Sequence, residues 1–135
     1  SGTGIRVSSS ATTPLKFVAT QCEMSNNGGS GLYISSSYNN IHFNVCLKNC
    51  ISHHNSTHGI SVTGRVVVNI HGDATAVHSN ILYGFRAARS GKFLLHLPSH
   101  HNTSYNNGNE ISPSSYLDVA ASICYVGNST SGTEK

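Results

Sequence analysis

The sequence predicts an all-β solenoid, a fold in which similar coils of short strands stack on one another. Three observations support this class. A motif of glycine, apolar residue, any residue and apolar residue recurs at steps of 27, 28, 25 and 26 residues, the last copy being weaker. An asparagine stands four residues before each recurrence. Between these marks the chain alternates apolar and polar residues, which is the two-residue period of a strand and not the period of a helix.

The repeat divides the chain into coils that begin near residues 4, 31, 59, 84 and 110. The copies are Gly4-Ile5-Arg6-Val7, Gly31-Leu32-Tyr33-Ile34, Gly59-Ile60-Ser61-Val62, Gly84-Phe85-Arg86-Ala87 and the weaker Glu110-Ile111-Ser112-Pro113. The asparagines in the same register are Asn27, Asn55, Asn80, Asn106 and Asn128. We expect these asparagines to form a ladder at one corner, because asparagine tolerates the left-handed backbone of a tight bend and its amide can bond to the next coil.

Each coil contains three alternating stretches, of which the repeat motif is the first. The second lies near residues 15–17, 41–45, 68–70, 95–97 and 117–119, and the third near 22–24, 50–52, 75–77, 101–103 and 123–125. Three strands in 22–28 residues predict a right-handed, single-stranded parallel β-helix of about five coils. The expected inward ladders are Ile5, Leu32, Ile60, Phe85 and Ile111; Val7, Ile34, Val62 and Ala87; and, in the second wall, Phe17, Phe43, Ile70 and Leu95.

The composition agrees with this fold and excludes several functions. Only 10 % of the 135 residues are charged, which suits a solenoid because like charges stacked one coil apart repel. A net charge of +3 is too small for a nucleic-acid groove, and no run of 18 apolar residues exists to span a membrane. We expect one β-helix segment over residues 1–135, and the start Ser1-Gly2-Thr3-Gly4 favours a fragment that contacts other segments of a longer chain.

The pattern Cys-x-x-x-x-Asn-x-x-x-Gly-Ile-x-Val, from residue 4 to about residue 132, resembles the right-handed β-helix superfamily of pectate lyases, polysaccharide epimerases and bacteriophage tailspikes. The abundance of Ser, Asn and His with few charges is most similar to a tailspike or tail-fibre shaft. This resemblance implies a homotrimer that recognises or depolymerises host cell-surface polysaccharide. It also implies a location in the virion or outside the cell, after assembly in the host cytoplasm. The alternatives are a polysaccharide lyase or epimerase of the pectate-lyase type, and a structural shaft without a ligand.

Outward-facing positions are the candidates for a binding site, since inward positions are occupied by packing. The first wall presents Arg6, Tyr33, Ser61, Arg86 and Ser112, and the second presents Lys16, His42, Asn69, His96 and Asp118, with His71 beside them. Guanidinium, phenol, imidazole and amide groups in a row suit a polyhydroxylated or acidic glycan. The predicted carbohydrate-binding residues are therefore Arg6, Tyr33, Arg86, His42, Asn69 and His96. The alternative is that these side chains form ordinary solvated strand faces.

Enzymatic activity is not expected from this segment alone. A glycosidase needs two carboxyl groups across one groove, and the only acids are Glu23, Asp73, Glu110, Asp118 and Glu134, none of which shares a column with another on an adjacent coil. A lyase can use a base such as His42, His71 or Tyr33, with Arg6 or Arg86 neutralising a uronate carboxylate. The weak catalytic candidates are His42, His71 and Arg86, in a lyase or glycosidase site completed by residues outside this segment.

The stretch Cys46-x3-Cys50-x2-His53-His54-x3-His58 contains residue types that bind zinc. The register argues against zinc, because Cys22 and Cys50 both lie nine residues before a repeat start and so point inward as small apolar groups. Neither a metal nor another cofactor is expected. A disulfide between Cys22 and Cys50 on adjacent coils is conceivable, but the cytosol would keep both thiols reduced.

Overall fold

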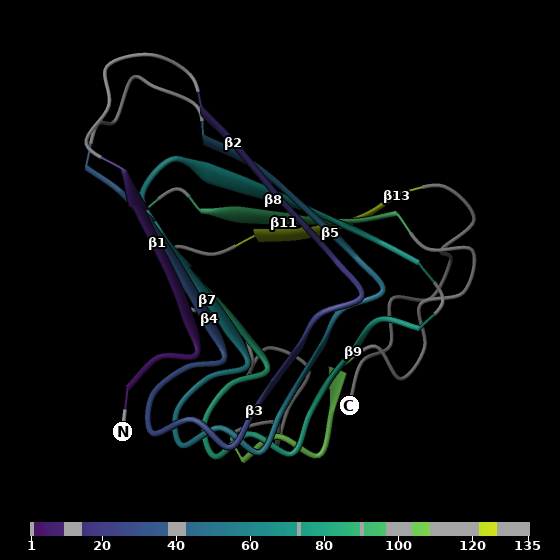
Figure 1. The fold of residues 1–135 in the computed structure, drawn as a ribbon. Helices are drawn as coiled ribbons and strands as arrows, with labels where there is room; N and C mark the ends of the chain where they lie inside the picture. The colour runs from purple at the N-terminus through teal and green to yellow at the C-terminus, as the bar shows by residue number, and fades with distance from the viewer. Residues whose placement is uncertain are drawn as a thin grey trace.

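The computed structural model describes residues 2–9, 15–37, 43–72, 74–89, 91–96, 104–108 and 122–126. Within these residues all the regular secondary structure is strand, and every strand pairing is parallel. The strands form three sheets that surround a common core, and the chain visits the three sheets in turn (Figure 1). The prediction of an all-β fold with parallel strands is thereby confirmed for the described residues, and the arrangement is consistent with a parallel β-solenoid.

The first sheet contains β1 (Ile5–Ser9), β4 (Leu32–Ser36), β7 (Ile60–Thr63) and β10 (Phe85–Ala88), in that spatial order. Its two inward rungs match the predicted ladders: they consist of Ile5, Leu32, Ile60 and Phe85, and of Val7, Ile34, Val62 and Ala87. Residues at both rungs in β4, β7 and β10 are buried. Ile111, expected to extend the first ladder, lies outside the described residues.

The second sheet contains β2 (Leu15–Thr20), β5 (Phe43–Lys48), β8 (Val66–His71), β11 (Lys92–His96) and β13 (Ser122–Val126). Its inward rungs are Leu15, Phe43 and Val66; Phe17, Val45, Val68 and Phe93; and Ala19, Leu47 and Ile70, with Leu95 in backbone register with Ile70. The predicted ladder of Phe17, Phe43, Ile70 and Leu95 is therefore wrong, because its members come from three different rungs. The cause is the connection before this sheet, which occupies residues 10–14 in the first coil but only residues 64–65 in the third. Counting residues from the repeat start therefore does not give the correct register of the strands in the second sheet.

The third sheet contains β3 (Glu23–Ser25), β6 (Ile51–His53), β9 (Ala76–His78) and β12 (Ser104–Tyr105). Its inward rung consists of Met24, Ser52, Val77 and Ser104, which are all buried. The repeat predicted that residue 103 would lie opposite Val77, but Ser104 occupies that place. The fourth coil is thus shifted by one residue relative to the prediction, and its expected stretch at 101–103 lies outside the described residues.

A ladder of buried asparagine amides follows the third sheet. The Nδ2 group of Asn27 donates to Oδ1 of Asn55, that of Asn55 to Asn80, and that of Asn80 to Asn107, each over 2.9 Å. Each acceptor oxygen also receives the backbone N–H of the preceding ladder residue, over 3.2, 3.1 and 3.0 Å. The predicted member Asn106 is wrong, since Asn107 occupies the ladder; Asn128 lies outside the described residues.

The left-handed backbone at this corner belongs to the residue before each ladder asparagine. Asn26, His54, Ser79 and Asn106 have φ values of 58, 55, 57 and 55°. Of the two roles expected for these asparagines, the hydrogen bonding of the amide to the next coil is confirmed. The left-handed bend, in contrast, is made by the residue before each of them.

Candidate functional site

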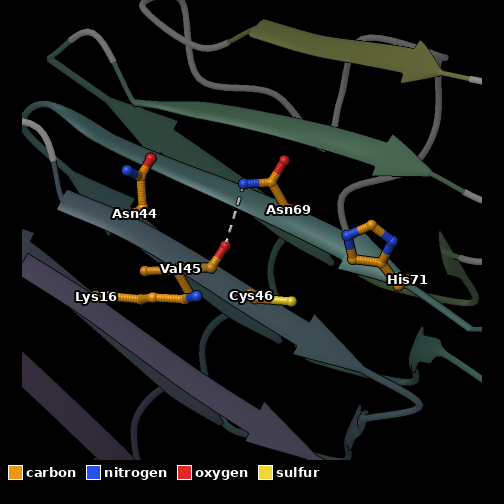
Figure 2. Close-up of a pocket in the computed structure, with 6 residues that line it drawn as sticks. All are labelled: Lys16, Asn44, Val45, Cys46, Asn69 and His71. Carbon is orange, nitrogen blue, oxygen red and sulfur yellow. Dashed lines mark hydrogen bonds between the residues drawn. The ribbon is translucent and has the colours of Figure 1, made fainter.

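A groove of about 360 Å³ lies on the outer face of the second sheet, which is a size typical of small-ligand sites. Lys16 on β2, Asn44 and Cys46 on β5, and Asn69 and His71 on β8 line it (Figure 2). The strand pleat places them there, because their neighbours in the sequence face the core. Phe43 and Val45, for example, are buried on the inner face, whereas Asn44 between them is exposed. The groove thus crosses three consecutive coils.

The side chain of Asn69 is fixed from both ends. Its Nδ2 group donates to the carbonyl oxygen of Val45 over 3.4 Å, as drawn in Figure 2, and its Oδ1 atom lies 2.8 Å from Nε2 of His96. Because Oδ1 can only accept, Nε2 of His96 carries the proton of this hydrogen bond. The ring of His96 also stacks on that of His71, with 4.5 Å between centroids and 13° between planes. The floor of the groove at this end is therefore held in one arrangement.

Burial lowers the pKa of His71 below the ordinary 6.5, and the neighbouring His96 and Lys48 act in the same direction. A histidine with a lowered pKa is neutral at neutral pH. In this form one ring nitrogen donates and the other accepts a hydrogen bond. His71 therefore offers both kinds of bond to a ligand in the groove.

The outer face of the second sheet is positively charged. Lys16, Lys48 and Lys92 are exposed on it, and no acidic residue occurs in the described strands of this sheet. Glu23, on β3 of the third sheet, is the one acidic residue in the described part of the chain. With no carboxylate in the described strands beside them, these lysines give the groove a positive potential that attracts anionic groups.

The carbohydrate-binding residues predicted from the sequence divide between two faces. Arg6, Tyr33 and Arg86 occupy one outward column of the first sheet, with Ser61 between the last two. The guanidinium carbon of Arg6 lies 5.2 Å from the centre of the Tyr33 ring. Asn69 and His96 lie on the second sheet instead, so the structure does not bring all these residues into one site.

The outward column predicted for the second sheet is wrong for the same reason as its inward ladder. Lys16 lies in register with Asn44, Val67 and Lys92; Asn69 with Cys46 and Leu94; and His96 with His71. The predicted members His42 and Asp118 lie outside the described residues. Sequence reasoning missed Asn44 and Cys46 as site residues, although their alternation with Phe43, Val45 and Leu47 places both on the outer face.

The histidines of the zinc-like stretch do not converge with its cysteines. Cys46 lines the groove and Cys50 is in the core, whereas the ring of His58 stacks on that of Tyr83 at 5.5 Å. Nε2 of His53 lies 2.6 Å from Oε2 of Glu23, and its Nδ1 lies 2.6 Å from Nδ1 of His54. No group of three or more His, Cys, Asp or Glu side chains in the described ranges is arranged to hold a metal ion.

The described part of the chain also contains no helix that could serve as a membrane span. No protein-family model, curated protein or solved structure matches the chain. The groove and its chemistry are therefore the features of this chain from which a function can be inferred.

The paired imidazoles make stability depend on pH. Burial lowers the pKa of His78, as do His53 and His54, and the pKa of His71 is lowered as described above. These two histidines bind fewer protons in the folded than in the unfolded chain, so a fall in pH through 6.5 favours unfolding. We expect the free energy of unfolding, measured in urea, to decrease between about pH 8 and about pH 5. The double variant His71→Gln and His78→Gln should show a smaller decrease; an unchanged decrease would contradict this explanation.

Proposed function

We propose that this chain is the polysaccharide-binding segment of a right-handed parallel β-helix of about five coils, and that it holds an acidic glycan on the outer face of its second sheet. Right-handedness is favoured because connections between parallel strands of one sheet almost always have this hand. The coil number is favoured by β13, which adds a fifth strand to the second sheet among the described residues.

The observation that carries the proposal is the groove with its lysine, two amides and one imidazole, on a face whose described strands contain no acidic residue. The ammonium group of Lys16 can pair with a carboxylate, sulfate or phosphate of the glycan. The amides of Asn44 and Asn69 and the imidazole of His71 can bond to sugar hydroxyl groups. Neighbouring strands lie about 4.8 Å apart, a spacing comparable to the length of one sugar residue, so a linear glycan crossing the strands meets one coil per sugar.

By its resemblance to tailspikes, the segment would belong to a homotrimer that recognises host cell-surface polysaccharide, located in the virion or outside the cell. The other segments of the longer chain would then provide trimer contacts beyond this one. The exposed apolar side chain of Val18, on the same outer face as the groove, gives such a ligand or partner an apolar contact beside the lysines.

The test is a calorimetric titration with oligogalacturonate, a chain of acidic sugars, and with a neutral maltooligosaccharide of equal length. We expect binding of the acidic chain only, weakened by salt. Lys16→Ala should weaken it about tenfold, because a charge-assisted hydrogen bond is lost. Arg6→Ala, on the first sheet, is the matched control and should bind normally. Equal losses of affinity in the two variants would mean that the binding site is not this groove. If neither oligosaccharide bound, a structural shaft would be favoured.

A lyase is the second candidate, and the neutral state of His71 favours it. A neutral imidazole beside a lysine-lined groove can remove the proton from the carbon that bears the uronate carboxylate. The glycosidic C–O bond at the neighbouring carbon then breaks, a C=C bond forms in the uronate, and the departing sugar oxygen takes a proton from water. The same mixtures distinguish the two functions. A lyase raises the ultraviolet absorbance of unsaturated uronate and loses this activity in His71→Ala, whereas a binding protein leaves the oligogalacturonate intact.

A further inference from the structure

Cys22 and Cys50 occupy equivalent positions on consecutive coils of the solenoid. They directly precede Glu23 and Ile51, which pair in register between β3 and β6. The carbonyl oxygen of Cys22 accepts the backbone N–H of Ile51 over 2.9 Å. The two residues therefore lie side by side, directly before the paired strands β3 and β6. The spacing of paired strands, about 4.8 Å, is within the range of Cα separations that a disulfide spans.

The two side chains have the same orientation. Each thiol lies 3.5 Å from the carbonyl oxygen two residues earlier, that of Thr20 for Cys22 and that of Lys48 for Cys50. The thiol of Cys50 also lies 3.5 Å from the carbonyl oxygen of Ala19, so it reaches toward the first coil. Burial raises the pKa of the Cys50 thiol, and a negative charge on the nearby Cys22 acts in the same direction.

We propose that Cys22 and Cys50 form a reversible disulfide that fastens the first coil to the second. This inference is independent of the polysaccharide-binding function. The two thiols are reduced in the cytosol, as expected from the sequence. They become oxidised when the protein reaches an oxidising compartment. In parallel, in-register cysteines the separation between the two Cβ atoms is near the upper limit that a disulfide permits. The bond is therefore strained and readily reduced again.

The oxidation proceeds by thiol–disulfide exchange with a small disulfide such as oxidised glutathione. Cys22 is half-buried and Cys50 is buried, so the Cys22 thiolate attacks first. One glutathione leaves as a thiol and the other stays on Cys22 as a mixed disulfide. The Cys50 thiolate then attacks the Cys22 sulfur and releases the second glutathione. Two cysteine thiols are oxidised, one small disulfide is reduced, and the two cysteine protons end on the two glutathione thiols.

The bond would join two coils that are otherwise held together by the parallel pairing of β1 with β4, β2 with β5 and β3 with β6. Separation of these two coils is the local opening that such a link resists. A link between Cys22 and Cys50 restricts this open state and so favours the closed one.

The experiment treats the full chain with oxidised glutathione, blocks remaining thiols with iodoacetamide, and identifies linked peptides by mass spectrometry. We expect a Cys22–Cys50 link with Cys46 still alkylated, and about tenfold slower hydrogen exchange at the Ile51 amide, which bonds to the first coil. Cys46→Ser is the matched control and should form the same link. Cys22→Ser and Cys50→Ala should each abolish both the link and the slower exchange.

Two results would overturn the proposal. One is glutathione that remains on Cys22 without ring closure in the folded protein. The other is a link from either residue to Cys46 or Cys124. Because the link is read in the wild-type chain, the test does not depend on the folding of the variants.

Discussion

Val68→Asp is expected to unfold the protein. Val68 is fully buried at the centre of the second sheet, in the rung with Val45 and Phe93. The described side chains around it are apolar, so a carboxylate there has neither water nor a hydrogen-bond donor to replace it. Burying such a group costs several kcal/mol, which is comparable to the whole stability of a small domain. We expect no cooperative transition when the circular dichroism of this variant is followed in urea.

Val67→Asp is the matched control for this variant. Val67 is the preceding residue on β8 and faces outward, in register with Asn44 and Lys92. A carboxylate at this position meets solvent and the ammonium group of Lys92, so the variant should stay folded and lose at most about 1 kcal/mol. A folded Val68→Asp together with an unfolded Val67→Asp would mean that the two faces of the sheet have been exchanged.

Asn55→Ala should produce the next largest effect. The Asn55 side chain is fully buried, and its Nδ2 group donates to Asn80, to the carbonyl oxygen of Met24 over 3.2 Å and to Oγ of Ser52 over 3.1 Å. Its Oδ1 atom accepts from both the backbone and the side chain of Asn27. Removing the carboxamide leaves several of these partners unsatisfied in the core, at a cost of about 3 kcal/mol or more.

The measurement is the free energy of unfolding in urea, with Asn44→Ala for comparison. Asn44 is exposed on β5 and is absent from the ladder, so its replacement should change stability by about 0.5 kcal/mol or less. If both variants lost the same amount of stability, the buried ladder would not be a source of stability.

Much of the fold could be predicted where a marker residue and a strand stay at a fixed separation. The glycine at each of the first four repeat starts directly precedes a strand of the first sheet, so the shared rung of Ile5, Leu32, Ile60 and Phe85 follows from the sequence alone. Gly59 shows why this marker is informative. A Cβ atom there would lie 2.8 Å from both the Asn80 amide nitrogen and the Gly84 carbonyl oxygen, a separation that leaves no space for a larger residue.

The register failed where the chain between marker and strand varies in length. The second strand of each coil follows a connection whose length differs from coil to coil. Hydrophobic alternation alone does not show whether Phe17 and Phe43 belong to the same rung. At the asparagine corner the ambiguity is chemical, since Asn106 and Asn107 are the same residue type. Only the pairing of Ser104 with Val77 decides which of the two amides enters the core.

The residues of the candidate site could be predicted from the sequence more fully than their arrangement in space. Lys16, Asn69 and His71 were already outward residues of the second wall, and the structure adds Asn44 and Cys46 between them. The stacking of His71 on His96 depends on the exact register of β8 and β11, which the repeat did not provide. The separation of Arg6 and Tyr33 from the groove likewise follows from their place on another sheet.

The asparagine ladder gives the solenoid a direction. Each ladder carboxamide from Asn27 to Asn80 donates to its C-terminal neighbour, and each from Asn55 to Asn107 accepts from its N-terminal neighbour, so their dipoles add along the stacking axis. Turning a single amide by half a rotation would set two oxygens face to face on one side and two NH₂ groups on the other. The orientation of the amides is therefore a collective property, and each coil constrains the conformation that the next can adopt.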